Sequence, residues 1–372
     1  MRGSLLFLIL TSSLNAQPPA FQVFPKKLTL RGPEASAQIL VLSTTQNQHN
    51  VDFTRQAKIT PTNPRLIRVN DAGQVFALKD GQTSLQVRWR AQTLSIPVTI
   101  RDVASPTPIS FRQDVIPILS AAGCNAGGCH GKAEGQNGFK LSVFGNDPRA
   151  DHLALIAEGR GRRISFASPK SSLFLRKATG ETGHGGGRKI ELDSLWYHRL
   201  HRWITEGAKF DTESATKVAR IIVQPSELTL APNASHQLRI TAVDEKGQIR
   251  DVTAEAELQS NFDTVAKVDE SGVHVTEVPG TAAILVRYMG HVAVCRVTVP
   301  RPGDSFKRPP EHNFIDKLVW NQLQKINIQP SGLCDDSTFL RRVFLDTIGT
   351  LPTAKEAGDF LSDQRKGKRS RL

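Results

Sequence analysis

The chain has 372 residues, of which 39% are hydrophobic and 22% charged, and its formal net charge is +13. This length and composition exclude a chain that is disordered throughout, and they allow two or three domains with separate cores. The basic residues are scattered along the sequence, which predicts a solvated basic surface.

The N-terminus has the pattern of a cleaved secretory signal over residues 1–16. Arg2 is followed by an apolar run from Leu5 to Leu10 and a small-residue exit at Ala16. The run is too short to span a bilayer, and no later segment predicts a transmembrane helix. We therefore expect a periplasmic, extracellular or cell-surface protein, whose partners are anionic polysaccharide or other cell-surface components and not nucleic acid.

Residues 21–103 and 219–300 contain short runs of alternating apolar residues, with glycine or proline near several breaks. The two segments align at a constant offset, since Gly73 falls on Gly272 and the difference, 272 − 73, is 199. The same offset pairs Gly81 with Gly280, Val87 with Val286, and Trp89 with Tyr288. We predict an internal repeat of two small β-sandwiches that resemble bacterial Ig-like domains.

Residues 107–210, between the repeats, change to a helical period. A first helix is predicted after Ser110, which is suited to cap it, and a second one ends at Gly207. Apolar residues at helical spacing mark the two buried faces: Val115, Ile116, Ile118 and Leu119 in the first, and Trp196, Leu200, Trp203 and Ile204 in the second. This segment is therefore expected to be mostly α-helical.

The segment "CNAGGCH" places Cys124 and Cys129 around four residues and follows them directly with His130. In c-type cytochromes two thiols bind the haem vinyl groups, and the adjacent histidine ligates iron. The usual motif has only two residues between the cysteines. Gly127 and Gly128 give the longer loop the freedom to bulge outward.

Three stretches together are similar to the cytochrome-c-like domain of large exported proteins of planctomycetes. These are "FRQDVIPILSAAGCNAGGCHGKAEGQNGFKLSVFGNDPRADH", "SPKSSLFLRKATGETGHGGGRKI" and "LHRWITEGA". The resemblance implies covalently bound haem c, and electron transfer to an unidentified redox partner protein that supports an oxidative or polymer-degrading system. In that family the haem domain is combined with Ig-like domains and followed by domains of unknown function.

A second axial ligand to the iron is expected to be a histidine. Met1 is lost with the signal, and Met289 lies at a turn of the second repeat. His184 is the preferred candidate, because the glycines of "TGHGGGRK" allow backbone to approach a flat cofactor. Other candidates are His152, which is a weaker ligand, and His198 and His201, which are predicted to face solvent. Four nearby bases could pair with haem propionates: Arg176, Lys177, Arg188 and Lys189.

Two other interpretations of the cysteines stay open. In the first, Cys124 and Cys129 form a disulfide in a cell-surface binding or scaffold protein whose sandwiches hold an anionic glycan. In the second, both cysteines bind zinc together with His130 and His184. A hydrolase is disfavoured because the chain contains no G-x-S-x-G nucleophile motif. Cys295 is predicted to be a buried apolar residue.

Residues 301–312 have the composition of a linker, and residues 313–372 predict helices. A capping box is expected between Thr353 and Glu356, and a helix stop at Gly349. The string "FLRRVFLDTIGTLPT" resembles the beginning of the planctomycete domain of unknown function. The predicted fold is therefore multidomain, with two all-β Ig-like sandwiches flanking a mostly α cytochrome-c-like domain and a short α-helical C-terminal segment.

Overall fold

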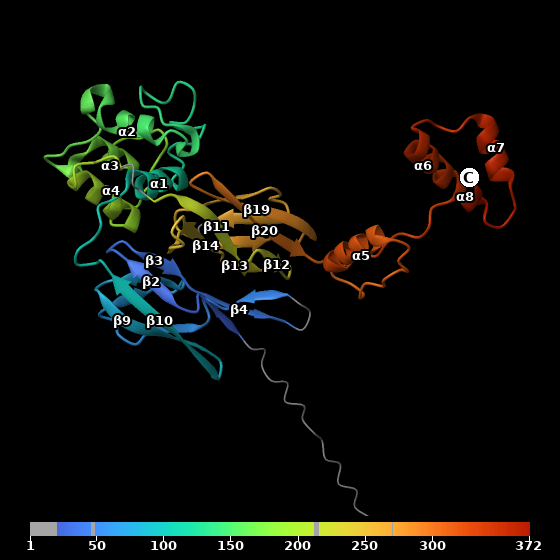
Figure 1. The fold of residues 1–372 in the computed structure, drawn as a ribbon, viewed down its shortest axis with the longest axis horizontal. Coiled ribbons are helices and arrows are strands. Elements are labelled where there is room, and N and C mark those ends of the chain that lie inside the picture. Colours follow the sequence, from blue (N-terminus) through green and yellow to red (C-terminus); the bar gives the residue numbers. More distant parts are fainter. Residues whose placement is uncertain (1–20, 46–48, 212–215, 270) are drawn as a thin grey trace, which may run out of the picture. The chain divides into compact units, whose positions relative to one another are not determined.

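The computed structural model describes residues 21–45, 49–211, 216–269 and 271–372. The predicted signal segment, 1–16, lies outside these residues. The chain is multidomain and mostly β-sheet, with helices between the sheets and a short helical segment at the C-terminus (Figure 1). It divides into two compact units at Arg301 and Pro302.

The first β region, drawn in blue in Figure 1, has ten strands in three small sheets. Its strands are β1 (Gln22–Phe24), β2 (Leu28–Arg31), β3 (Ser36–Gln38), β4 (Leu40–Thr44), β5 (Asn50–Asp52), β6 (Lys58–Pro61), β7 (Ile67–Val69), β8 (Gln74–Ala77), β9 (Gly81–Trp89) and β10 (Gln92–Arg101). The sheet orders are β1-β4-β5, β2-β10-β9-β6 and β3-β8-β7, with β2 parallel to β10. Alternate apolar side chains from these sheets meet in one hydrophobic core.

The second β region repeats this arrangement strand for strand. Its strands are β11 (Val218–Gln224), β12 (Glu227–Thr229), β13 (Ser235–His236), β14 (Arg239–Asp244), β15 (Ile249–Asp251), β16 (Glu257–Ser260), β17 (Ala266–Asp269), β18 (Gly272–Val275), β19 (Gly280–Tyr288) and β20 (His291–Val299). The sheet orders are β11-β14-β15, β12-β20-β19-β16 and β13-β18-β17, again with β12 parallel to β20. If ten is added to each strand number in the sheet orders of the first region, the sheet orders of the second region result. The sequence repeat is therefore also a structural repeat.

Two glycines that align in the repeat, Gly73 and Gly272, are required for steric reasons. A Cβ atom on Gly73 would lie 2.5 Å from Cγ2 of Thr54, and one on Gly272 would lie 2.5 Å from the carbonyl oxygen of His236. Both residues also have positive φ angles, of 77° and 122°. Glycine is therefore required at both positions by close approach and by backbone conformation.

The helical region lies between the two β regions in sequence. It contains the π-helical turn η1 (Phe111–Val115), α1 (Ile116–Ala121), η2 (Val143–Gly145), α2 (Pro148–Ile156), η3 (Glu158–Gly161), η4 (Pro169–Ser171), α3 (Leu173–Ala178) and α4 (Leu195–Thr205). Ser110 and Ser194 cap η1 and α4, because their hydroxyls accept from Gln113 N and Tyr197 N. Phe111 and Trp203 are fully buried, with ring centres 5.3 Å apart, and they join the first and last helices in one core.

The C-terminal unit consists of α5 (Phe314–Ile326), α6 (Asp336–Ile348), α7 (Ala354–Ser362) and α8 (Lys368–Arg371). Thr353 and Glu356 form the predicted capping box at the start of α7. Gly349 ends α6 in the left-handed conformation, with a φ angle of 74°. Local capping chemistry therefore defines these helix ends, as the sequence predicts.

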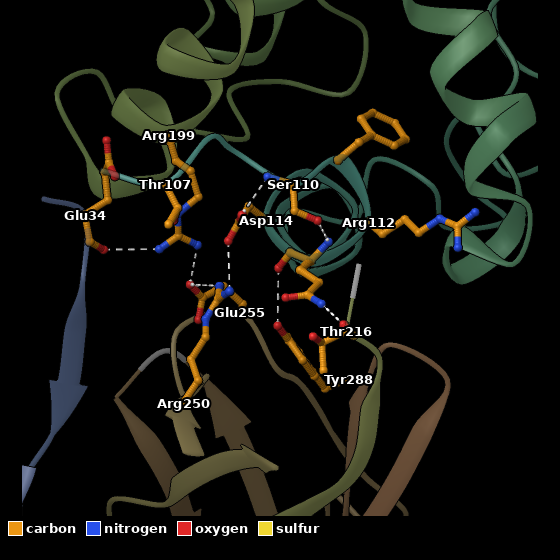
Figure 2. A network of polar contacts seen from close by, with 12 residues as sticks. Glu34, Thr107, Ser110, Arg112, Asp114, Arg199, Thr216, Arg250, Glu255 and Tyr288 are labelled. Atoms are coloured by element: carbon orange, nitrogen blue, oxygen red, sulfur yellow. Dashed lines mark hydrogen bonds and ion pairs between the residues drawn. The ribbon is translucent and has the colours of Figure 1, made fainter. Parts of the chain in front are cut away.

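A buried network of charges joins the helical region to the second β region (Figure 2). Arg199 on α4 contacts Glu255 at 2.6 Å, and Arg250 on β15 contacts Asp114 on η1 at 2.8 Å. Arg250 also lies 3.7 Å from Glu255, so the four side chains alternate in charge. Burial opposes ionisation of Asp114, but the adjacent Arg250 and Arg199 outweigh it and lower the pKa of this carboxyl group.

The first β region joins the helical region through Glu34. The Glu34 carboxylate accepts two hydrogen bonds of 2.8 Å from Arg202, and its backbone carbonyl accepts one of 3.1 Å from Arg199. A two-bond pairing of this kind defines the orientation of both groups. Helix α4 therefore contacts both β regions: Arg202 and Arg199 bind Glu34 of the first, and Arg199 also binds Glu255 of the second. Figure 2 shows the two contacts of Arg199.

Candidate functional site

The CNAGGCH segment forms a closed loop directly after α1. Cys124 N donates to Leu119 O at 2.8 Å and so continues from the helix end, and His130 N donates to Cys124 O at 3.0 Å. Gly131 N donates to Ala126 O at 3.0 Å. A Cβ atom on Gly131 would lie 2.1 Å from Asn125 O, so only glycine fits directly after the histidine.

The two thiols of this loop differ in exposure. Cys124 is buried, which raises the pKa of its thiol to about 11, whereas Cys129 is half-buried. All four cysteines of the chain fall within the described residues, and all four are free thiols in the structure. Cys295 is fully buried, as predicted, and burial raises the pKa of its thiol to about 12.

One ring nitrogen of His130 forms a hydrogen bond within the described chain, and the other does not. Its Nδ1 lies 3.0 Å from Phe139 O, and its ring packs against the Phe139 ring at 4.5 Å between centres. A carbonyl oxygen can only accept, so Nδ1 carries the proton and Nε2 keeps a lone pair. Burial lowers the pKa of His130, and nearby His184 and Arg163 act in the same direction. The neutral imidazole that metals bind is therefore favoured.

His184 repeats this arrangement in the glycine-rich loop between α3 and α4. Its Nδ1 lies 2.8 Å from Gly187 O, which again assigns the proton to Nδ1 and leaves Nε2 as an acceptor. A Cβ atom on Gly186 would lie 3.2 Å from Cε1 of His184, so a side chain there would crowd the ring. The loop is tied back to α3 by Lys177 Nζ, which donates to Gly183 O at 2.6 Å.

His130 and His184 lie close together with nearly parallel ring planes. Their ring centres lie 6.2 Å apart and their planes differ by 8°. A metal–nitrogen bond is about 2 Å and an imidazole nitrogen lies about 1 Å from the ring centre, so imidazoles on opposite sides of one metal have centres about 6 Å apart. The distance between the ring centres would allow His130 and His184 to hold one metal-containing group through their Nε2 atoms, and the two cysteines adjoin His130.

The other histidines and the bases that the sequence suggests as site residues make different contacts. His152 is buried, and its Nε2 is engaged by Ala208 O at 2.7 Å, so it belongs to the core with Phe111 and Trp203. His198 is exposed, as predicted, whereas His201 is half-buried against Tyr197 with ring centres 6.1 Å apart. Of the four bases expected near a cofactor, Lys177 holds the loop, and Arg188 forms an exposed ion pair with Glu191 at 3.0 Å.

Arg163 is a site residue that sequence analysis missed. The sequence predicts a solvated basic surface, yet Arg163 is only 5% exposed. Its guanidinium donates to the carbonyls of Gly138, Ala154 and Glu158 at 2.6 to 2.8 Å and lies over the Phe139 ring at 4.5 Å. It therefore holds the segment whose carbonyl orients His130. Nothing in the sequence distinguishes it from its exposed neighbours.

The zinc interpretation finds no support in the described part of the chain. Within it, no group of three or more His, Cys, Asp and Glu side chains is placed to hold a metal ion. A four-ligand set of Cys124, Cys129, His130 and His184 would be such a group.

One family model matches the C-terminal unit. Residues 314–372 match the model described as "PSCyt2: Protein of unknown function (DUF1549)". This match confirms the expectation that a planctomycete-type domain of unknown function begins near residue 313. No curated protein matches the chain. Among residues 21–45, 49–211, 216–269 and 271–372, no helix combines the length and apolar character needed to cross a membrane.

Solved structures of surface proteins show low similarity to the chain. Domains 5–6 of the S-layer protein SbsC match at 10% identity and a TM-score of 0.29, covering 76% of this chain and 99% of that one. A longer SbsC structure matches at 11% identity and a TM-score of 0.20, and the chain covers only 24% of its length. InvD of Yersinia pseudotuberculosis matches at 11% identity and a TM-score of 0.14, covering 78% and 60%. Values this low support no conclusion about fold or function.

Proposed function

We propose that residues 107–210 form a c-type haem domain of an exported electron-transfer protein. In this proposal Cys124 and Cys129 hold the haem covalently, and His130 and His184 ligate the iron through Nε2. The observation that carries the proposal is the pair of parallel imidazoles, 6.2 Å apart, each with its Nδ1 proton directed to a backbone carbonyl. Second-sphere bonds of this kind typically orient metal-binding histidines.

Each residue of the site has a separate task in this proposal. Phe139 O and Gly187 O keep the proton on Nδ1, so that neither imidazole has to lose a proton before it binds metal. Arg163 positions Phe139 and therefore His130. When bound, haem supplies a one-electron centre, and its potential depends on the axial ligands and on burial. The redox partner and any oxidative or polymer-degrading system that the protein supports belong to the proposal as well.

Mass spectrometry of protein made with a c-type haem maturation system tests covalent attachment. We expect the mature chain to gain about 616 Da and to show a Soret band. The double variant Cys124→Ser/Cys129→Ser should lose the added mass, whereas Cys334→Ser, which changes a cysteine of the C-terminal unit, should keep it. A wild-type chain without added mass under these conditions would reject the proposal.

Optical and electron paramagnetic resonance spectra test the ligands. With haem attached, wild-type protein should be low-spin, and His184→Ala should become high-spin because one axial position loses its imidazole. His198→Ala, an exposed histidine of α4, is the matched control and should stay low-spin. An unchanged spectrum of His184→Ala would assign the second ligand to another residue.

A second candidate is a cell-surface binding or scaffold protein, and the junction network favours it. Arg199 and Glu255 are buried, Arg250 is half-buried, and the arginines and the glutamate have opposite charges, so their task in this candidate is to hold parts of the molecule together. In this candidate Cys124 and Cys129 form a disulfide under oxidising conditions. Retention of haem-free protein on immobilised polygalacturonate, lost at high salt, together with a mass 2 Da below that of the reduced chain, would support it.

A further inference from the structure

A chain of hydrogen bonds connects a serine, a histidine and an aspartate in the second β region. Ser235 Oγ lies 2.8 Å from His274 Nδ1, and His274 Nε2 lies 2.9 Å from Asp269 Oδ1. Ser235 is on β13 and His274 is its cross-strand partner on β18, while Asp269 ends β17. Three neighbouring strands of one sheet therefore supply the three groups.

The donors and acceptors of this chain can be assigned. Asp269 accepts from Ser271 N at 2.7 Å and from Ser271 Oγ at 2.6 Å, and these bonds lower the pKa of its carboxyl group to about 2. His274 Nε2 lies 2.9 Å from this ionised carboxylate and 2.8 Å from Ser271 Oγ, and because Ser271 Oγ gives its own proton to Asp269, both oxygens accept from Nε2. This leaves Nδ1 of the neutral ring to accept the hydroxyl proton of Ser235. A nucleophile paired with a base that a third group orients is the arrangement used for acyl transfer.

The fold does not require this set of residues, because the first repeat makes the equivalent turn without it. There Asn70 Oδ1 accepts from Ala72 N and Gln74 N, and this is sufficient to close the turn between β7 and β8. Ser36 of β3, which aligns with Ser235, lies opposite Phe76. The repeat thus has a serine at the same place in both copies but a base beside it only in the second.

A cavity of about 220 Å³ adjoins the serine and the histidine. Ser235, Ser271 and His274 line it from the second β region, and Arg55 and Asp52 line it from the first. The Asp52 carboxylate is occupied by hydrogen bonds from two backbone N–H groups, those of Thr54 and Gln237. Among the residues that the structure describes, none forms a hydrogen bond or an ion pair with Arg55. Its guanidinium is therefore available to a carboxylate or to a developing oxyanion in the cavity.

We propose that Ser235, His274 and Asp269 form an acyl-transfer site that hydrolyses small esters carrying a carboxylate. Ser235 Oγ attacks the ester carbonyl while its proton moves to His274 Nδ1, and this proton then passes to the departing alcohol. Water afterwards attacks the acyl group on Ser235, gives its proton to His274 and releases the acid, which returns the serine hydroxyl. Asp269 stabilises the imidazolium in both steps, and Arg55 binds the substrate carboxylate. The site is independent of the proposed haem.

Hydrolysis of 4-nitrophenyl acetate and of its carboxylate-bearing analogue, 4-nitrophenyl succinate, tests the proposal on the full chain. We expect kcat/KM of Ser235→Ala and His274→Ala to fall by about 10²- to 10⁴-fold, the range typical for removal of acid–base groups. Ser36→Ala, the equivalent serine of the first repeat, is the matched control and should keep the wild-type rate. Arg55→Ala should lower kcat/KM more for the succinate ester than for the acetate, because only the succinate carries the carboxylate that Arg55 binds.

A fluorophosphonate probe followed by peptide mass spectrometry provides a second measurement that does not depend on turnover. Ser235 should be labelled in the wild type, and labelling should fall in His274→Ala because the hydroxyl then has no base. Absence of hydrolysis above the buffer rate, a wild-type rate in Ser235→Ala, or labelling at another serine would each overturn the proposal.

Discussion

The charged junction and the histidine pair are both partly buried polar regions of the same unit, and they differ in whether their bonding capacity is used. In the junction, Arg199, Arg250, Asp114 and Glu255 each lie against an opposite charge. In the histidine pair, His130 and His184 each use Nδ1 and keep Nε2 unused by any bond within the described chain. A polar group whose bonds are satisfied holds the fold, whereas one that keeps a lone pair can bind a ligand.

This contrast makes different predictions for mutation. Removing one partner of a buried pair leaves the other charge uncompensated, so junction variants should lower the free energy of unfolding. Removing an imidazole with an unused nitrogen should change ligand binding and leave stability almost intact.

Glu255→Ala should have the largest effect, because it leaves Arg199 and Arg250 facing each other without the carboxylate between them. We expect a loss of about 3–5 kcal/mol in the free energy of unfolding, measured by urea denaturation and circular dichroism. Arg31→Ala, which breaks an exposed pair with Asp102 at 3.8 Å, is the control and should cost at most about 1 kcal/mol. Equal losses in the two variants would mean that the junction is not a stabilising network.

Asp114→Asn should have a smaller effect that depends on pH. Folding lowers the pKa of Asp114, so its carboxylate stabilises the native state above the unfolded pKa and loses that contribution as the pH falls through the folded pKa. The variant should be less stable than wild type by about 2–3 kcal/mol at pH 7, and the difference should shrink below about pH 4. Denaturation curves at pH 7, 5 and 3 measure this. A difference that stays constant with pH would contradict the role of the charge.

Tyr288→Phe removes the weakest bond of the junction. The Tyr288 hydroxyl donates to Gln113 O at 3.5 Å, which is long for a hydrogen bond. Burial raises the pKa of this hydroxyl to about 12, so it keeps its proton at neutral pH. We expect a loss of about 0.5–1 kcal/mol by urea denaturation. A loss as large as that of Glu255→Ala would show that the hydroxyl is an essential member of the network.

His184→Ala should have the smallest effect on stability, because the residue is half-buried in a loop that Lys177 holds through a backbone carbonyl. We expect the free energy of unfolding of haem-free protein to change by less than about 0.5 kcal/mol. The same variant is expected to alter the spin state of haem-loaded protein. A large loss in the free energy of unfolding of the haem-free variant would show that His184 stabilises the fold. The histidine pair would then not differ from the junction in this respect.

Local signals in the sequence predicted the helices and their ends well. Ser110 and Ser194 cap helices as their residue type suggests, Gly349 ends α6, and Thr353 with Glu356 forms a capping box. These features depend on neighbours within four residues, so a sequence contains nearly all of the information that determines them. The repeat was also visible, because its glycines are required by close approach in both copies.

The sequence does not show which side chains distant from one another in the chain come into contact. Arg163 and Arg199 look like other surface bases in the sequence, but both are buried with their guanidiniums paired. His152 looked like a possible ligand, and its imidazole is used by Ala208 O, 56 residues away. The hydrogen bonds that connect Ser235, His274 and Asp269 were missed for the same reason, since Ser235 and His274 come together only when β13 pairs with β18.

The sequence by itself determined the division into repeats and helical segments, the capped helix ends, and the closed loop that carries Cys124, Cys129 and His130. These follow from backbone sterics and from bonds between near neighbours. The parallel placement of His184 and His130 and the alternation of four charges at the junction appear only in the folded molecule. Such pairings depend on packing between segments distant in sequence, and side chains acquire their chemistry from the neighbours that packing gives them.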